Sequence, residues 1–339
     1  MFWRKSARLT GGACGLRGVV VAAAVAAVAV PLTGAAREVG PTRVGGEVPG
    51  TAVVYRVSEA EQRAALAYWT PSRMVAAVRA AVPQAGILPK GLPPKAGLQA
   101  AHFTGVPTVG ALFSLLDNKG YTAHTCTASV VDSPVGDIVL TAAHCVDWSG
   151  LSKDIVYVPD WHEVKGKVVM PYGRWAVQVI YVSPGWLTKQ DKNTVQNPNL
   201  DFAFMTVAPV SKRQIQAVTG GLRVGFQLGY THTIEVIGYN VGDSEPVRCA
   251  TKSLQFIVGK GTKHPIEFLQ FDCNGFWTGT SGGPWIIGYN GKSGTGTVFG
   301  VIGGYQRGGS TSAVSYSSYF GNDVRQLMET AEKKASGSA

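Results

Sequence analysis

Long apolar runs and regular repeats are almost absent from this chain of 339 residues. The longest apolar run, Gly18 to Val30, has 13 residues and is rich in alanine, whereas a membrane-spanning helix needs about 20. No segment repeats at a fixed period and no heptad pattern occurs, which excludes a solenoid or a coiled coil. The other apolar runs are short and rich in Val, Ile, Phe and Thr, and they lie among 43 glycines and 18 prolines. This composition favours short strands joined by turns over long helices.

Motifs that bind metals or nucleic acids are missing as well. The six histidines are dispersed, and neither HExxH nor a paired CxxC occurs, so we expect no metal and no cofactor. The net charge of +10 includes four basic residues in the first 17 positions; without them it is +6, and the remaining basic residues form no run. No nucleic-acid recognition motif accompanies them, so we interpret the positive charge as a solvated surface.

The first 36 residues predict a signal peptide. Basic residues without acids come first, the apolar run follows, and small residues suited to a signal peptidase occupy positions 33–36. A membrane anchor is the alternative, which the short apolar run disfavours. Cys14 precedes the apolar run instead of following it, so it does not form a lipoprotein site. We therefore predict a secreted protein without a stable membrane anchor.

The cysteines that remain after removal of this segment are even in number. They are Cys126, Cys145, Cys249 and Cys273. In an exported protein four cysteines predict two disulfide bonds, and the sequence by itself permits three pairings.

Residues 37–104 differ in character from the rest of the chain. Glycines and prolines mark the beginning, Ala and Val at helical spacing follow from about Ser58 to Val82, and four prolines between positions 83 and 94 exclude regular structure there. We interpret residues 37–104 as a pro-region that ends in a linker, so that the protein is made as a zymogen. The alternative is an N-terminal extension that stays attached.

From residue 105 onward the pattern is that of an all-β protein. The candidate strands are short, rich in β-branched and aromatic residues, and separated by Gly, Pro, Asn and Asp. They are Val109–Leu115, Thr127–Val131, Ile138–Thr141, Ile155–Val158, Ala176–Val182, Asp201–Val207, His232–Tyr239, Ile266–Asp272 and Val298–Tyr305. A helix is predicted near residues 322–334, with Val324, Leu327 and Met328 on one face. Many strands with one terminal helix favour a β-barrel architecture over an alternating α/β sheet.

Three segments carry residue types that nucleophilic catalysis requires. His144 follows a short apolar strand in the string TAAHC, where a bond at Cys145 can fix it. Ser281 lies in GTSGGP, where glycines on both sides allow a tight turn and the amides of Gly279 and Ser281 can bind an oxyanion. Asp201 opens the apolar string DFAF, and pairing with His144 would offset the cost of burying its carboxylate.

Each of these segments also has an ordinary interpretation. A lone histidine is most often a surface residue, a Gly-Ser turn is most often a plain loop, and an aspartate at a strand edge can cap a turn. The three together, in the order His, Asp, Ser and at intervals of 57 and 80 residues, predict a catalytic triad.

Together these segments resemble the trypsin- and chymotrypsin-like serine protease superfamily over roughly residues 105–331. The string CTAS at Cys126 and the string PYGRW at Pro171 are similar to the exported bacterial branch related to glutamyl endopeptidases, and YWTP at Tyr68 resembles precursors of actinobacterial members. The resemblance implies two six-stranded antiparallel β-barrels with a C-terminal helix, and hydrolysis of peptides or proteins by a monomer.

The resemblance also implies a disulfide pairing and a specificity pocket. It selects Cys126 with Cys145, and Cys249 with Cys273, among the three possible pairings. It places the pocket at Gly275, Ile302, Gly303, Gly304 and Tyr305. None of these residues is an acid or a histidine, so preference for a basic residue or for glutamate is not supported, and an apolar residue before the cleaved bond is expected.

Position 280 sets this chain apart from the digestive members of the superfamily. Those have an aspartate before the nucleophile that pairs with the new N-terminus, whereas Thr280 has no carboxylate. We therefore expect maturation without that latch.

Two other functions compete with peptidase activity. Gly279 to Gly283 also matches G-x-S-x-G, the nucleophile elbow of esterases, but that fold needs a histidine after the serine and the last one here is His264. A catalytically silent binding protein on the same fold is the other alternative, which the complete triad disfavours.

Overall fold

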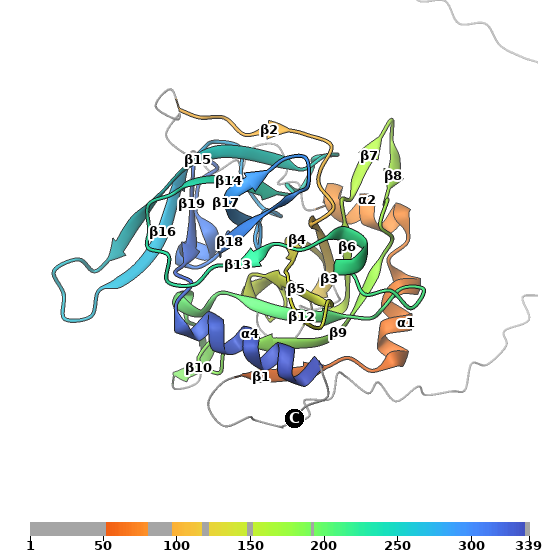
Figure 1. The fold of residues 1–339 in the computed structure, drawn as a ribbon, viewed down its shortest axis with the longest axis horizontal. Helices are drawn as coiled ribbons and strands as arrows, with labels where there is room; N and C mark the ends of the chain where they lie inside the picture. Colours follow the sequence, from red (N-terminus) through yellow and green to blue (C-terminus); the bar gives the residue numbers. More distant parts are fainter. Residues whose placement is uncertain (1–51, 81–96, 117–121, 148–151, 191–192, 336–339) are drawn as a thin grey trace, which may run out of the picture. The chain divides into compact units, whose positions relative to one another are not determined.

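The first of the two β-structures in the chain is a closed antiparallel barrel of six strands (Figure 1). The computed structural model describes residues 52–80, 97–116, 122–147, 152–190 and 193–335; the predicted signal peptide lies outside them. The barrel strands are β3 (Val109–Leu116), β4 (Thr122–Val130), β5 (Ile138–Thr141), β6 (Lys153–Pro159), β9 (Trp175–Val182) and β12 (Ala203–Val207). The ring runs β9-β12-β5-β4-β3-β6 and closes where β6 pairs with β9, so this part of the barrel has no free edge.

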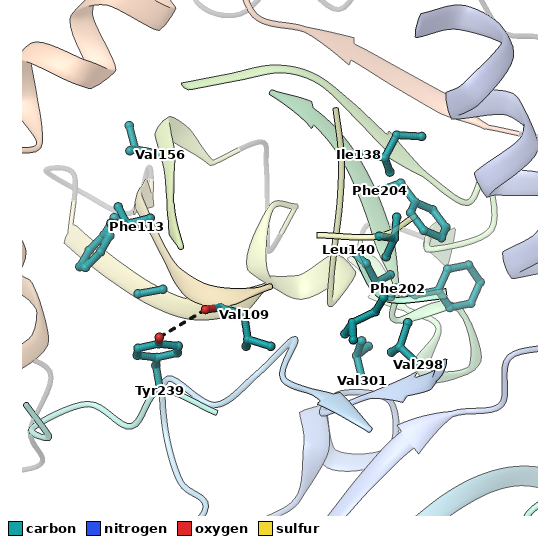
Figure 2. Close-up of a cluster of buried hydrophobic side chains, with 14 of the residues drawn as sticks. Val109, Phe113, Ile138, Leu140, Val156, Phe202, Phe204, Tyr239, Val298 and Val301 are labelled. Atoms are coloured by element: carbon teal, nitrogen blue, oxygen red, sulfur yellow. Dashed lines mark hydrogen bonds between the residues drawn. The ribbon is translucent and has the colours of Figure 1, made fainter. Parts of the chain in front are cut away.

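The barrel strands are apolar on both sides because one side fills the barrel and the other packs against neighbouring elements. All residues of β5 and β12 are buried. Figure 2 shows Leu140, Phe202 and Phe204 packed together, with Val298 and Val301 of the second sheet next to them. The core therefore continues from the barrel into the second sheet, and Phe202 at this junction directly follows Asp201.

The second half is a sheet of eight strands, six of which form its antiparallel body. These are β18 (Thr295–Val301), β17 (Pro284–Asn290), β14 (Thr233–Gly238), β15 (Val247–Val258), β16 (Ile266–Asp272) and β19 (Val314–Ser318), in sheet order. β13 (Arg223–Val224) adds to β18 in parallel, and β2 (Ala101–His102) adds to β15. β18 and β19 come together where the Val301 N–H donates to Ser317 Oγ. The all-β fold expected from the sequence is confirmed.

The segment before the linker packs on the first barrel. β1 (Val53–Arg56) pairs with β9 beside the point where β6 closes the ring, and α1 (Glu59–Tyr68) contacts β6 and β9. The single helical stretch expected over residues 58–82 is in fact two helices, α1 and α2 (Pro71–Ala80). The break lies at Trp69 and Thr70, because Pro71 tolerates only the first turn of a helix.

The C-terminal helix α4 (Asn322–Ala335) lies against β12 and β9, with Val324, Leu327, Met328 and Ala331 buried (Figure 1). The remaining elements are short: β7 (His162–Val164), β8 (Lys167–Val169), β10 (Leu187–Gln190), β11 (Asn193–Gln196), α3 (Gln216–Thr219), and the single turns η1 (Ala143–Cys145), η2 (Pro198–Leu200) and η3 (Tyr305–Gly308). Among the described residues no helix is long and apolar enough to cross a membrane.

Candidate active site

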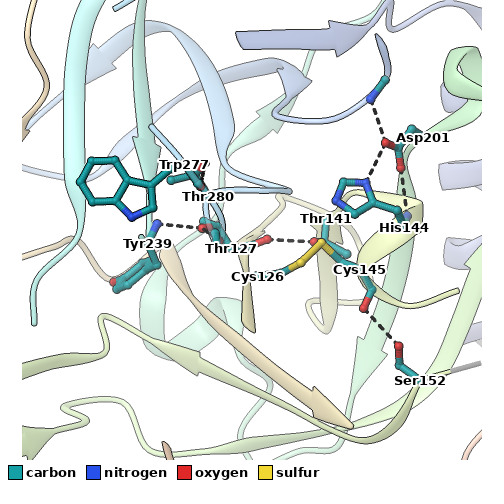
Figure 3. The surroundings of a disulfide bond; sticks show 12 residues. Cys126, Thr127, Thr141, His144, Cys145, Ser152, Asp201, Tyr239, Trp277 and Thr280 are labelled. Atoms are coloured by element: carbon teal, nitrogen blue, oxygen red, sulfur yellow. Dashed lines mark hydrogen bonds and ion pairs between the residues drawn. A yellow bond between two sulfur atoms is a disulfide. The ribbon is translucent and has the colours of Figure 1, made fainter. Parts of the chain in front are cut away.

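His144 is held by a short helical turn and a disulfide bond. Strand β5 ends at Thr141, and the chain turns through η1, which carries His144 between Ala143 and Cys145. Cys145 is bonded to Cys126 on β4, so the turn is tied covalently to the next strand of the barrel (Figure 3). The imidazole is buried, with 2% of the residue exposed.

Asp201 accepts three hydrogen bonds although its residue is only 1% exposed. Its Oδ2 accepts from the backbone N–H of Gly304 at 2.8 Å and lies 2.8 Å from Nδ1 of His144, while Oδ1 accepts from the His144 backbone N–H at 2.9 Å (Figure 3). A buried carboxylate is costly unless such partners satisfy it. Because Nδ1 faces Asp201, Nε2 is the ring nitrogen that a general base would use.

Ser281 lies in a turn that only glycine permits at two positions. Gly279 has φ of +100° and Gly282 has φ of +82°, which L side chains rarely adopt. The Gly282 N–H donates to the Ile302 carbonyl at 2.7 Å, which anchors the turn on the second sheet. Among the described residues, none accepts a hydrogen bond from the backbone N–H of Gly279 or Ser281. The two amides that the sequence analysis proposed as oxyanion donors are therefore not consumed within the described fold.

Thr127 joins the serine turn to the histidine turn, a role that the sequence analysis missed. Its N–H donates to the Ser281 carbonyl at 2.7 Å and its hydroxyl donates to the Gly279 carbonyl at 3.0 Å. The Thr127 carbonyl accepts from the Thr141 hydroxyl at 2.8 Å, at the end of the strand that leads to His144. Figure 3 shows the bond between Thr127 and Thr141 beside the disulfide. Thr127 and Thr141 are both fully buried, and buried polar groups need partners, but the sequence by itself does not show this burial.

Two of the residues expected in the specificity pocket, Gly303 and Gly304, lie next to Asp201 of the candidate triad. Gly304 donates its N–H to Asp201, and a Cβ on Gly303 would lie 3.0 Å from Oδ2 of the same carboxylate. Ile302 is buried and exchanges backbone hydrogen bonds with the serine turn through the Gly282 N–H and the Gly283 carbonyl.

The other two predicted pocket residues lie in different surroundings. Gly275 donates its N–H to the Ser312 carbonyl and accepts from the Asn240 side chain. The Tyr305 ring packs in an aromatic cluster with three rings from β15, β16 and β19: Phe256, Phe268 and Tyr316.

One cluster of cysteine and histidine side chains has the spacing of a metal site, but its cysteines form a disulfide bond. Cys126, Cys145 and His144 present ligand atoms within 4.8 Å of one another. Both sulfurs belong to the same disulfide, so neither is a thiolate, and thiolates are what a metal binds. The second disulfide joins Cys249 on β15 to Cys273 after β16, so the two bonds have the pairing that the resemblance implied.

Comparison with known proteins places the fold among serine proteases. No family model matches the sequence, and no curated protein sequence is similar to it. The protease Anisep from Arthrobacter nicotinovorans matches with a TM-score of 0.56 and 24% identity over 69% of this chain and 99% of its own. The thermostable serine protease AL20 from an extremophilic microorganism matches with a TM-score of 0.52 and 21% identity over 67% of this chain and 97% of its own. The chain therefore has the chymotrypsin-like fold of these proteases.

Proposed function

We propose that the protein is a secreted serine endopeptidase that uses His144, Asp201 and Ser281 as its catalytic triad. The observation that carries the proposal is the arrangement at Asp201, whose carboxylate holds both Nδ1 and the backbone N–H of His144. This arrangement fixes the tautomer that lets Nε2 act as a general base. The chymotrypsin-like fold of its structural neighbours supports the same conclusion.

The proposed reaction needs only groups of this chain. His144 removes the proton of the Ser281 hydroxyl as the oxygen attacks the peptide carbonyl, and Asp201 stabilises the imidazolium that forms. The N–H groups of Gly279 and Ser281 donate to the oxyanion, and each such donor contributes roughly 3 kcal/mol to the transition state. His144 then protonates the leaving amine, and water repeats the sequence to release the acyl group from Ser281.

The finer points of the proposal follow from the sequence. We propose export by the segment at residues 1–36, synthesis with a pro-region, and action on peptides or proteins with an apolar residue before the cleaved bond. Thr280 supports maturation without an aspartate latch, because its hydroxyl donates to the Trp277 carbonyl at 2.8 Å and the side chain is buried.

Labelling by a fluorophosphonate tests the proposed nucleophile. We expect the active protein to be labelled, Ser281→Ala to lose labelling, and Ser293→Ala, which changes an exposed serine of the β17–β18 turn, to keep it. A protein that is folded but never labelled would instead be a silent binding protein. Hydrolysis of a peptide library by a separate, unlabelled sample of the same protein then separates a peptidase from an esterase and reports the preferred residue.

A further inference from the structure

We propose that residues 98–102, upstream of the first barrel, remain part of the active enzyme and, with Asn240, position the turn that donates to the oxyanion. The proposal rests on the proposed function and extends it to residues that do not touch the reacting atoms. It also moves the start of the functional domain upstream of residue 105, where the sequence analysis had placed it.

The upstream segment is attached to the chain that leads into the serine turn. The Asn274 N–H donates to the Leu98 carbonyl at 2.9 Å, and the Ala100 N–H donates to the Asn274 carbonyl at 2.8 Å. The Asn274 side chain adds a bond to Gln99 Oε1 at 2.8 Å. Asn274 therefore has its backbone and its side chain held by the upstream segment, one residue before Gly275.

Asn240 holds the next residues of the same loop from inside the protein. Its Nδ2 donates to the Gly275 carbonyl at 2.9 Å, and its Oδ1 accepts from the Trp277 N–H at 3.0 Å. The neighbouring Val241 donates its N–H to the Thr278 carbonyl at 2.8 Å and accepts from the Trp277 indole at 3.0 Å. Residues 275, 277 and 278 are thus all bonded to Asn240 or Val241, directly before the donor Gly279.

The two supports are connected to each other through Asp243. Its Oδ2 accepts from Asn240 Nδ2 at 2.9 Å and lies 2.9 Å from Nε2 of His102 on β2. The His102 side chain is 51% exposed, and exposed ion pairs contribute little. Asn240 is only 3% exposed, and a buried amide that loses its partners is costly. The main effect is therefore expected at Asn240 and in the backbone pairing of residues 98–100, with His102 as a minor contributor.

The oxyanion donors of the serine turn depend on support from residues outside the turn. Gly279 lies in the left-handed region, and its N–H has no acceptor among the described residues, so no hydrogen bond of that N–H itself fixes its direction. Thr280 has no carboxylate that a new N-terminus could bind. The residues around the turn must therefore keep the donors in place, and catalysis is sensitive to small displacements of such donors.

Substitution of Asn240 in the full chain tests the positioning role. We expect Asn240→Ala to lower kcat about tenfold or more, with KM within about twofold, because a misplaced oxyanion donor affects the transition state and not the bound substrate. Asn240→Asp keeps the size but removes the Nδ2 donor, and we expect it to show the same split between kcat and KM. The matched control is Asn290→Ala, which removes two side-chain to backbone bonds at the far end of β17 from Ser281 and should leave both parameters unchanged.

Active-site titration of each sample by the fluorophosphonate normalises kcat to the folded, competent fraction. A variant of Asn240 that folds poorly is then still measured on the molecules that react. Unchanged kcat per titrated site in both Asn240 variants would overturn the positioning role.

The N-terminus of the active enzyme tests the part that concerns residues 98–102. We expect N-terminal sequencing to place it at or before Leu98. Ala100→Pro removes the N–H that Asn274 accepts, and we expect it to lower kcat in the same way. A fully active enzyme whose first residue lies after His102 would refute the proposal. Absence of any labelling at Ser281 in the unaltered chain is a different result, because it contradicts the proposed function itself.

Discussion

Oδ2 of Asp201 lies 2.8 Å from Nδ1 of His144 and accepts the Gly304 N–H as well, so one carboxylate oxygen joins the first barrel to the second sheet. Asp201→Asn replaces this acceptor by an amide that cannot hold the imidazole in the required tautomer or stabilise its charge. We expect kcat for peptide hydrolysis to fall on the order of 10³- to 10⁴-fold. A cooperative unfolding transition of the variant in denaturant then shows that it is still folded. Near-normal kcat in a folded Asp201→Asn protein would remove Asp201 from the triad.

Gly282, which follows the proposed nucleophile Ser281, has no room for a side chain and also has a backbone conformation that favours glycine. A Cβ on Gly282 would lie 2.2 Å from the Thr127 carbonyl oxygen and 2.2 Å from Thr141 Oγ1, the two groups that join the serine and histidine turns. We expect Gly282→Ala to abolish fluorophosphonate labelling. Gly288→Ala is the matched control, since Gly288 also has positive φ but a Cβ added there would meet no atom within 4 Å, and the change should cost only about 1 kcal/mol and keep labelling. Labelling of Gly282→Ala at the normal rate would show that the turn can rearrange freely.

The segments of the proposed triad stand out in the sequence because each is a local string with its own chemistry. Asp201 opens an apolar string, and glycines flank Ser281, so both positions stand out without knowledge of the fold. Gly304 was expected only in the specificity pocket, because its bond to Asp201 exists only once the second sheet packs against η2. The roles of Thr127 and Asn240 depend on the same long-range packing, and no short string reveals them.

Strands could be predicted from the sequence where apolar, β-branched residues dominate the segment. Ile138–Thr141 was predicted with its exact limits, whereas the long strand β15 was missed. Its buried positions alternate with exposed ones that include Arg248 and Lys252, so charge obscured a period of two that the sequence does contain. The break between α1 and α2 was not predicted, although Pro71 marks it, because proline starts a helix more easily than it continues one.

Because Asp137 is buried, we expect the free energy of unfolding of the protein to depend on pH through this carboxyl group. It is buried before β5, its Oδ1 has no hydrogen-bond partner among the described residues, and burial raises the pKa of Asp137 to about 6. The folded protein therefore binds a proton between about pH 4 and pH 6 that the unfolded chain has released. The contribution of this group to stability is greatest below pH 4 and decreases as the pH rises to 6.

Asp137→Asn removes this titration while keeping the shape of the side chain. We expect the free energies of unfolding of the two proteins to differ little at pH 4, and the variant to be more stable at pH 7.5 by on the order of 2 kcal/mol. Urea unfolding at both pH values measures the difference. A variant that is less stable than the parent at pH 7.5 would mean that the ionised carboxylate of Asp137 is stabilised in the folded state.

The segment with β1, α1 and α2 should stay bound to the barrel even after the chain is cut between α2 and β2. Trp69 is 1% exposed, packs on Phe113 at a centroid distance of 5.3 Å and donates its indole N–H to the Asp154 carbonyl. Arg174, directly before β9, donates to the Leu66 and Trp69 carbonyls at 2.7 and 2.6 Å, which caps the end of α1. These contacts, with the pairing of β1 on β9, resemble the interior of one domain more than a loose pro-region.

Trp69→Ala tests that attachment directly. Loss of a buried tryptophan leaves a cavity, and we expect a cost of about 3–5 kcal/mol in the free energy of unfolding of the uncut chain. In the cut protein we expect the parent fragments to elute together in size-exclusion chromatography and the Trp69→Ala fragments to separate. Arg63→Ala, on the exposed side of α1, should behave as the parent in both measurements. Separation of the parent fragments would show that the segment is released on cleavage, as a conventional pro-region is, and that the barrel is stable with the β9 edge uncovered.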